Sequence, residues 1–241
     1  IRDHRGGGRS SARETAVRVA GGAFAQLLLN EFKIEVLSGV LGIGKVVSDK
    51  IDFDFAKNSQ IYALGNEEAM KEAVNKARSE HDSVGAVVLS VARGVPAGLG
   101  EPLYDRLDSA LAAALMGING VKAVEIGAGV NVSSMLGSAN NDEMDELGFL
   151  SNNAGGILGG ISSGAEIMLK SHFKPTPSIF KEQKTLNLAG EAVDFELRGR
   201  HDPCIGIRGS VVATAMIRLV LADMLLLNAS TKLENLKKIY G

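Results

Sequence analysis

The sequence has a single cysteine, Cys204, and no tryptophan among its 241 residues, and only 5 prolines. One cysteine excludes a disulfide framework and a site of four thiolates, and it is compatible with a reducing, cytoplasmic compartment. An excess of charge of one sign is also missing, because 26 Lys and Arg stand against 28 Asp and Glu. The surface as a whole is therefore predicted to attract neither nucleic acid nor an anionic membrane.

A long uninterrupted apolar run is absent as well. The longest stretch, residues 211–227, contains Arg218 and Asp223, which argues against a membrane span and favours a buried helix. No signal peptide is recognisable at the start. The sequence begins at Ile1 rather than Met, so we expect the natural protein to have a further N-terminal portion.

Helical and strand-like patterns follow one another without a strict βαβ order. Helical periodicity predicts helices around residues 69–77, 104–116 and 211–227, the first with Asn66 as its N-cap. Strand-like patterns cover residues 33–40, 84–91, 121–126, 166–173 and 192–197. Several of these strands have two distinct faces. We therefore predict an α+β fold in which antiparallel sheets enclose buried helices, with residues 1–241 forming a single domain.

Residues 127–165 are rich in Gly, Ser and Asn and show little periodicity. A loop of this length inside a compact domain is usually functional or disordered. We expect this segment to carry part of a binding site.

The N-terminal region places arginines around three consecutive glycines, Gly6 to Gly8. Ser11 and Glu14 have the spacing of a capping box, which predicts that a helix starts here. The expected core face of that helix consists of Ala16, Val19, Ala20, Ala23, Phe24, Leu27 and Leu28. A Gly-rich turn before a helix offers backbone N–H groups to an anion, although a surface loop with solvated arginines is an equally good interpretation.

Other familiar motifs lack their context. Gly39, Gly44 and Lys45 approach the P-loop spacing, but Val46 stands where a hydroxyl is required and no helix is expected to follow. No dinucleotide-binding glycine motif lies between a strand and a helix, and the four histidines show no metal-ligand spacing. Cys204 is interpreted as a small buried residue rather than a nucleophile.

Three further segments combine groups that bind ligands. Residues 174–178 join a lysine and two hydroxyls with two stiff prolines, residues 152–164 are dense in glycine, and residues 198–204 bring two arginines together with His201 and Asp202. Their purely structural interpretations are a strand exit, a flexible loop and a salt-bridged turn. Two arginine clusters beside glycine-rich turns favour a site for a small molecule with several negative charges.

Four motifs in order and spacing resemble those of the chorismate synthase family: RGGGRSSARET at residues 5–15, GVPAGLGEP at 94–102, the glycine run at 152–164 and GRHDPC at 199–204. The resemblance implies a β-α-β sandwich, with helices between antiparallel sheets, and assembly as a homotetramer. It also implies an N-terminal segment with two catalytic histidines, neither of which His4 matches.

The reaction implied by the resemblance is the anti-1,4-elimination of phosphate from 5-enolpyruvylshikimate 3-phosphate to give chorismate. It requires reduced FMN, which an external reductant can supply, and has no net redox change. The protein would thus be a carbon–oxygen lyase of the shikimate pathway. The alternatives are a non-catalytic flavin- or nucleotide-binding module, a structural protein, or a fragment that is inactive without the N-terminal histidines.

The resemblance also assigns site residues. Those expected to bind FMN are Arg9, Ser10, Ser11, Asn119, Gly120, Gly159, Lys174, Pro175, Thr176, Pro177, Ser178 and Arg200. Arg13 and Arg200 are expected to contact anionic groups of the substrate. Asp202 is expected to lie near the flavin and to manage its proton.

Overall fold

The computed structural model describes residues 8–197 and 201–241 of the chain. The α-helices are α1 (Thr15–Glu31), α2 (Phe53–Asn58), α3 (Glu67–Ser79), α4 (Leu107–Met116), α5 (Gly137–Asn140), α6 (Gly206–Ala229) and α7 (Leu233–Tyr240). Three 3-10 helices add η1 (Gly8–Ser10), η2 (Ala12–Glu14) and η3 (Gly129–Ser134). The α+β class predicted from the sequence is confirmed.

The long strands are β1 (Glu35–Ile43), β3 (Ala86–Arg93), β4 (Val121–Ile126) and β9 (Ile167–Phe173), and β2 (Val46–Val47) is a short addition to β1. They form a five-stranded sheet in the order β2-β1-β3-β9-β4, in which every neighbouring pair is antiparallel. Three separate hairpins are β5–β6 (Met144–Asp145 with Gly148–Phe149), β7–β8 (Ile157–Leu158 with Ile161–Ser162) and β10–β11 (Gln183–Leu186 with Ala192–Phe195). β4 has the predicted bounds, and the other predicted strands are shifted by at most three residues at either end.

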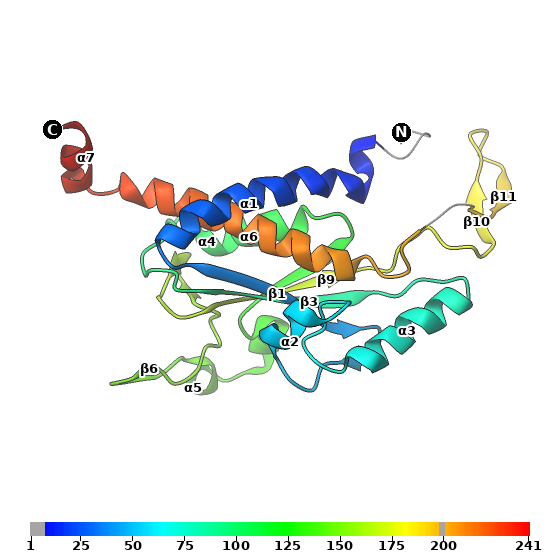
Figure 1. The fold of residues 1–241 in the computed structure, drawn as a ribbon, viewed down its shortest axis with the longest axis horizontal. Coiled ribbons are helices and arrows are strands. Elements are labelled where there is room, and N and C mark those ends of the chain that lie inside the picture. Colours follow the sequence, from blue (N-terminus) through cyan, green and yellow to red (C-terminus); the bar gives the residue numbers. More distant parts are fainter. Residues whose placement is uncertain (1–7, 198–200) are drawn as a thin grey trace.

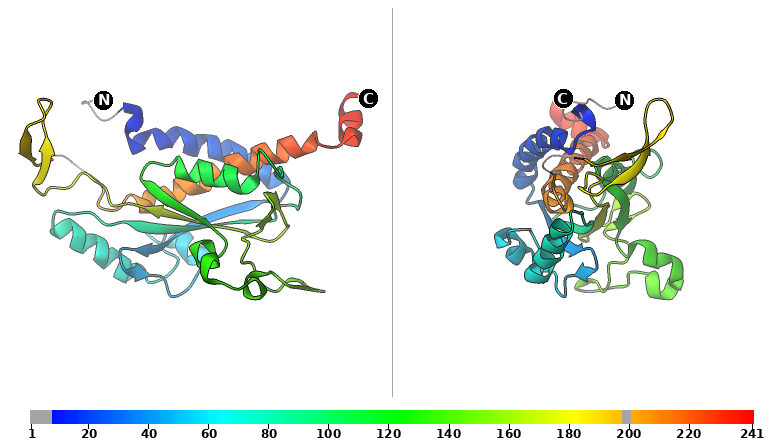
Figure 2. Two further views of the ribbon diagram at one scale, coloured as in Figure 1. Left: turned by 180° about the vertical axis from the view of Figure 1, so that it is seen from behind. Right: turned by 90° about the vertical axis from the view of Figure 1, so that its right-hand side faces the viewer.

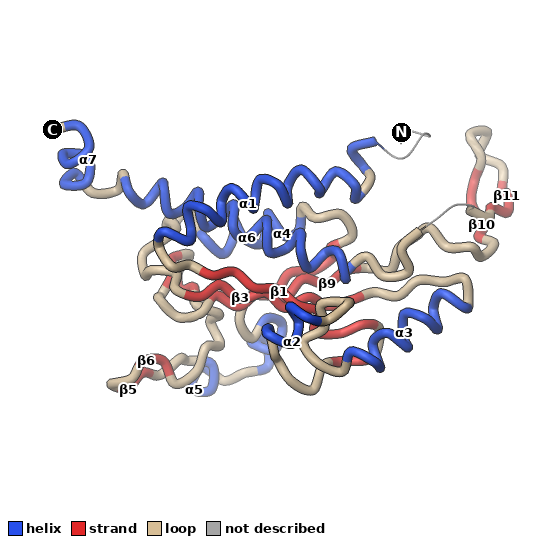
Figure 3. The backbone as a smooth tube through the Cα atoms, viewed as in Figure 1, coloured by secondary structure: helices blue, strands red, loops and turns tan. Residues whose placement is uncertain are grey.

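Helices α1, α4 and α6 form a layer on one face of the sheet, and α2 and α3 lie on the other (Figures 1, 2 and 3). The last long helix, α6, packs on β1, β3 and β9, while α1 and α4 pack against α6. Together these elements enclose the largest apolar cluster, which includes Leu29, Val88, Leu111, Leu169 and Ile217. The predicted burial of the last helix is confirmed. α6 is long and apolar enough to cross a membrane, but its packing in this core accounts for that composition.

Two glycines allow this layer to pack closely. A Cβ on Gly22 of α1 would collide with the backbone and side chain of Ala215 in α6. A Cβ on Gly209 of α6 would enter the ring of Phe173 at the end of β9. Because hydrogen atoms stand where side chains would be, α6 lies nearer to α1 and to the sheet than larger residues would permit.

The expected core face of α1 is wrong in part. The buried residues are Gly22, Ala25 and Leu29, whereas Phe24 and Leu27 are 75% and 64% exposed. Ala16, Ala20 and Ala23 are exposed too, and only Val19 and Leu28 of the expected set pack against the core. The close contact at Gly22 determines which stripe of α1 faces α6, and periodicity alone does not reveal such a contact.

The expected N-cap of α3 is also wrong in its mechanism. Asn66 precedes α3 but has a left-handed backbone, with φ of 50°, and makes no side-chain cap. Its Nδ2 instead donates to the Val47 carbonyl at 3.0 Å. The side chain therefore fastens the start of α3 to β2 rather than satisfying the first amides of the helix.

The glycine-rich segment 127–165 is more structured than expected. It contains η3, α5 and the hairpins β5–β6 and β7–β8. The Asp142 carboxylate organises part of it by accepting from Ser151 Oγ at 2.7 Å and from the backbone N–H groups of Asn153 and Ala154 at 2.6 and 2.8 Å. Polar bonds to one carboxylate therefore replace an apolar core in this segment.

Candidate functional site

Four segments that are distant in sequence meet near the N-terminal end of α6. Asn119 Nδ2 donates to the Ser10 carbonyl at 3.3 Å, which joins the turn after α4 to the start of the chain. The Lys174 N–H donates to the Gly120 carbonyl at 2.9 Å, and Thr176 Oγ1 donates to the Asp202 carbonyl at 2.8 Å. These three bonds assemble most of the predicted site residues around one location.

The N-terminal turns present Arg9, Ser10, Ser11 and Arg13 just before α1. Ser11 is the N-cap of η2, and its Oγ accepts from the Arg13 N–H at 3.4 Å. The capping box is incomplete, because Glu14 pairs with Arg18 at 2.8 Å instead of returning to the Ser11 amide. The side chains of Arg9 and Arg13 are left exposed, where they can meet an anionic ligand.

The turn between α4 and β4 requires glycine at position 120. Gly120 has φ of 91°, and the Ile205 side chain occupies the space that a Cβ would need. Next to it, Asn119 Oδ1 is buried and accepts no hydrogen bond from the described residues. A buried amide oxygen without a donor carries a desolvation cost, which a ligand that donates a hydrogen bond would remove.

The loop after β9 is held in place through its backbone. Ser83 Oγ donates to the Thr176 carbonyl at 2.6 Å, while the Thr176 hydroxyl is bonded to the Asp202 carbonyl. Lys174, Pro175 and Pro177 are exposed, and Ser178 is half-buried. A cation and hydroxyls are thus carried on a stiff segment, as the sequence predicted.

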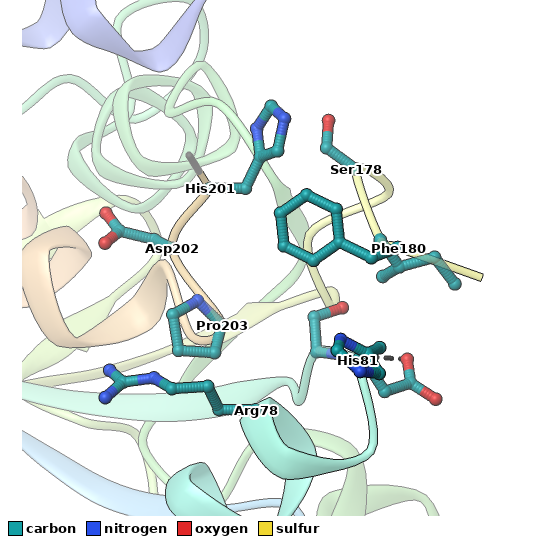
Figure 4. A pocket seen from close by; sticks show the side chains of 10 residues that line it. Arg78, His81, Ser178, Phe180, His201, Asp202 and Pro203 are labelled. Carbon is teal, nitrogen blue, oxygen red and sulfur yellow. Dashed lines mark hydrogen bonds between the residues drawn. The ribbon is translucent and has the colours of Figure 1, made fainter. Parts of the chain in front are cut away.

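The loop before α6 directs its side chains to different sides. His201 lines a small hollow of about 40 Å³ together with Ser178, Phe180 and Asp202, and its ring centroid lies 5.9 Å from that of Phe180. The Asp202 carboxylate turns away from Phe180 (Figure 4) and pairs with Arg208 of α6 at 3.1 Å. His201 Nε2 is buried without a partner among the described residues. Arg200, the remaining predicted residue of this loop, lies outside the described residues.

Gly159 is separated from this group. It lies in the β7–β8 hairpin beside Gly160, whose carbonyl accepts from the Leu107 N–H at the start of α4. Asn119 and Gly120 follow the other end of α4, so the ten-residue helix, about 15 Å long, lies between them and Gly159. Within the part of the chain that the structure describes, Gly159 is not brought to the other predicted residues.

The excluded motifs have other roles. Gly44 and Lys45 form the tight turn between β1 and β2, with no helix after it, so they make no P-loop. Cys204 is buried, and burial raises the pKa of its thiol to about 11, which makes a nucleophilic role unfavourable. No group of three or more His, Cys, Asp or Glu side chains within residues 8–197 and 201–241 is placed to hold a metal ion.

A family model described as chorismate synthase matches residues 1–226. The chain belongs to the chorismate synthase family. Among curated relatives, the chorismate synthase of Campylobacter concisus (strain 13826) is 98% identical over 241 residues, and that of Campylobacter curvus (strain 525.92) is 73% identical over 240 residues. Both matches cover all of this chain and 68% of the relative. A crystal structure of a chorismate synthase matches 95% of this chain and 68% of its own, with a TM-score of 0.77 at 31% identity.

Chorismate synthases are lyases of the shikimate pathway, which leads to the aromatic amino acids. The chain therefore has chorismate synthase function rather than that of an unrelated flavin- or nucleotide-binding module or a structural protein. The resemblance noted in the sequence is confirmed over the residues that carried it.

Some residues of the site were not found from the sequence. Arg18 Nη1 donates to the Gly117 carbonyl at 2.9 Å and so fastens the turn carrying Asn119 to α1. Arg208 is the partner of Asp202, where the sequence suggested the adjacent Arg200 and His201. The i, i+4 spacing of Glu14 and Arg18 could have indicated their ion pair, but no local pattern connects Arg18 to Gly117.

Proposed function

We propose that the residues gathered near the start of α6 form part of the site at which phosphate is eliminated from 5-enolpyruvylshikimate 3-phosphate to give chorismate. The observation that carries this proposal is the convergence of Ser10, Asn119, Lys174 and Asp202 through three hydrogen bonds. Those residues are up to 192 positions apart. The bonds of Asn119 and Thr176 are made by side chains outside the helices and strands, and the Lys174 bond extends the β4–β9 pairing by one residue.

The described residues fit a flavin. The unpartnered Asn119 Oδ1 can accept from an N–H group, and the unpartnered His201 Nε2 is a further polar atom for a ligand. Ser10, Ser11 and the loop containing Lys174, Thr176 and Ser178 would hold the polar groups of FMN, with Arg9, Gly120 and the two prolines shaping the cradle. When bound, reduced FMN supplies the electron density that weakens the bond to the departing phosphate.

The substrate carries two carboxylates and a phosphate, so its site needs several cations. Arg13 is exposed beside the N-terminal turn, and we assign it to an anionic group of the substrate. Arg200 is assigned to the same task and to FMN by the family match alone. Fixed guanidinium groups would stabilise the negative charge that builds up on the leaving phosphate.

Asp202 is proposed to hold or release the proton of the reduced flavin. Its pairing with Arg208 would orient the carboxylate and keep it available as an acceptor. The competing interpretation is that this ion pair only shapes the turn before α6.

The remaining proposals rest on the family match. The working protein would be a cytoplasmic homotetramer that receives reduced flavin from an external reductant, and residues 1–241 would belong to one domain. α4 separates Gly159 from the other described site residues. A contact between Gly159 and a flavin would therefore involve a part of the assembly beyond the described residues.

FMN binding tests the cradle. In the intact natural polypeptide, Lys174→Ala should weaken binding of reduced FMN in the presence of substrate by about 10-fold to 100-fold, because a charge-assisted hydrogen bond is lost. Lys45→Ala, which removes an exposed lysine in the β1–β2 turn, is the matched control and should change nothing. Equal affinity of both variants in a fluorescence titration would rule out the assignment of Lys174.

Asp202→Asn tests the proton role. The substitution keeps the volume, so FMN affinity should remain nearly normal while single-turnover chorismate formation falls about 100-fold. Arg208→Gln removes the partner and not the carboxylate, and it should cost less activity than Asp202→Asn. If Asp202→Asn lowers only the thermal midpoint and the flavin affinity, the carboxylate has a purely structural role.

A further inference from the structure

Arg218 lies within the most apolar helix of the protein. Its Nη2 reaches the Val36 carbonyl only at 3.4 Å, and its Nε is buried with no partner among the described residues. No carboxylate of those residues lies within ion-pair distance, and desolvation lowers the pKa of Arg218 despite the opposing effect of Glu35. A half-buried guanidinium with so few partners requires an explanation.

The Arg218 side chain lines an open cavity of about 440 Å³ between α1, α6 and the beginning of β1. The other charged groups lining it are Lys33, Lys57 and Glu35, so cations outnumber carboxylates. Lys57 is paired with Asp54 at 3.0 Å, whereas Lys33 has no carboxylate within ion-pair distance in the described chain. Gln26 Oε1, also at this cavity, is buried without a donor.

Lys33 adopts a conformation that favours glycine. Its φ is 56°, at the position where α1 ends and the Ile34 N–H donates back to the Leu29 carbonyl at 3.0 Å. Helices that end in this way usually have Gly at the left-handed position. A lysine there strains the backbone and places a cation at the cavity.

The cavity also borders an open edge of the sheet. β1 pairs with β2 only at Gly42 and Ile43, and the outward bonds of Val40 go to residues 62 and 64. By strand alternation the N–H and C=O of Val36 point to the same side, where the carbonyl meets Arg218. The Val36 N–H is therefore an additional donor toward this side.

We propose that this cavity binds the phosphate or carboxylate group of a small anion, held by Arg218 and Lys33. A guanidinium and an ammonium on two elements match such a group. The site is independent of the proposed catalytic site, because Arg218 lies twelve residues beyond Gly206, about 18 Å along α6.

Calorimetric titration with inorganic phosphate, and separately with malonate, tests the proposal. Both titrations use a Lys174→Ala background to weaken phosphate binding at the other site. Arg218→Met keeps the apolar stem, and it should weaken binding of the preferred anion at least 10-fold, while Lys45→Gln should not. Tighter binding of phosphate or of malonate identifies the group. An affinity unchanged by Arg218→Met, or no saturable binding of either anion, would overturn the site.

Lys33→Gly gives a second, independent test should Arg218→Met fold poorly. Relief of the left-handed strain should raise the thermal midpoint, and loss of the cation should weaken anion binding. A higher midpoint with unchanged affinity would contradict the proposal. Crystals soaked in selenate should show its anomalous signal between Arg218 and Lys33, and a signal only elsewhere would contradict it as well.

Discussion

The two faces of the five-stranded sheet are covered in different ways. On one face, α6 packs directly on β1, β3 and β9 and is covered in turn by α1 and α4. On the other, α2 and α3 lie over β1 and β2. There β9 and β4 carry the polar cluster Glu125, Lys170 and His172, with Glu125 bonded to His172 at 2.9 Å and to Lys170 at 3.2 Å.

This difference explains where the candidate catalytic site can form. Close packing on the face covered by α6 fixes the ends of α4, β9 and α6 relative to one another. The site residues lie next to these ends. The face beneath α2 and α3 is packed as well, but its apolar clusters are smaller and none of the site residues named above belongs to them. A precise arrangement of loops therefore depends on the rigidity of the layer beneath it.

The largest effect is expected from filling the close contact on the covered face. Gly209→Ala would place a methyl group in the Phe173 ring and should lower the free energy of unfolding by about 2 to 3 kcal/mol. Chemical denaturation measures this change.

Phe173→Leu in the same chain should recover part of the loss by making room, so the two changes should be less than additive. Additive effects would show that α6 does not rely on this contact. Because Phe173 adjoins Lys174, Gly209→Ala should also disturb the candidate site.

An intermediate, local effect is expected in segment 142–154, which is organised by a carboxylate rather than by a core. Burial favours a higher pKa for Asp142, but the hydrogen bonds from Ala154, Ser151 and Asn153 outweigh it and hold that pKa below its ordinary value. Asp142→Asn should cost about 1 to 3 kcal/mol locally and speed hydrogen exchange at the Ala154 amide by about tenfold or more.

The same carboxylate predicts the direction of pH dependence. A pKa that is lower in the folded segment than in the unfolded chain gives a stabilisation that is complete above the unfolded value of about 3.9. It is lost as the pH falls through the lowered value. Protection of the Ala154 amide should therefore decrease on acidification below about pH 4, and Asp142→Asn should remove that dependence. A pH dependence retained in Asp142→Asn would refute the assignment.

The sequence predicted the elements better than their mutual contacts. The pattern of residues 121–126 was sufficient to predict β4, because Val124 and Ile126 share the face that packs against the core, although a register shift between Val121 and Ala123 interrupts the alternation. Periodicity could not choose the inner stripe of α1, since Phe24 and Leu27 suit a core as well as Ala25 and Leu29 do. That choice depends on Gly22 and Ala215, which are 193 residues apart.

The candidate site shows the same limit. The motifs identified Ser10, Lys174 and Asp202 as chemically suitable, and the family resemblance added Asn119 and related all four to one ligand. The partners of these residues could not be predicted: Arg208 for Asp202, Ser83 for the Thr176 carbonyl and Arg18 for the turn at Gly117. Each of these contacts depends on tertiary packing rather than on a local sequence pattern.

The smallest effect is expected from the polar cluster on the other face of the sheet. Glu125 is 11% exposed but its partners Lys170 and His172 are about one-third exposed, so water screens the interaction. Glu125→Gln should lower the free energy of unfolding by about 1 kcal/mol or less, because the neutral amide still accepts one bond while the Lys170 charge loses its counter-ion.

Lys122→Gln on the same strand is the control. It removes a charge with no ion pair among the described residues, and it should have almost no effect on the free energy of unfolding. Lys170→Met combined with Glu125→Gln should cost less than the sum of the single changes, since the unpaired charge is then gone. A loss with Glu125→Gln as large as that with Gly209→Ala would show that this cluster is as important to stability as the close packing beneath α6.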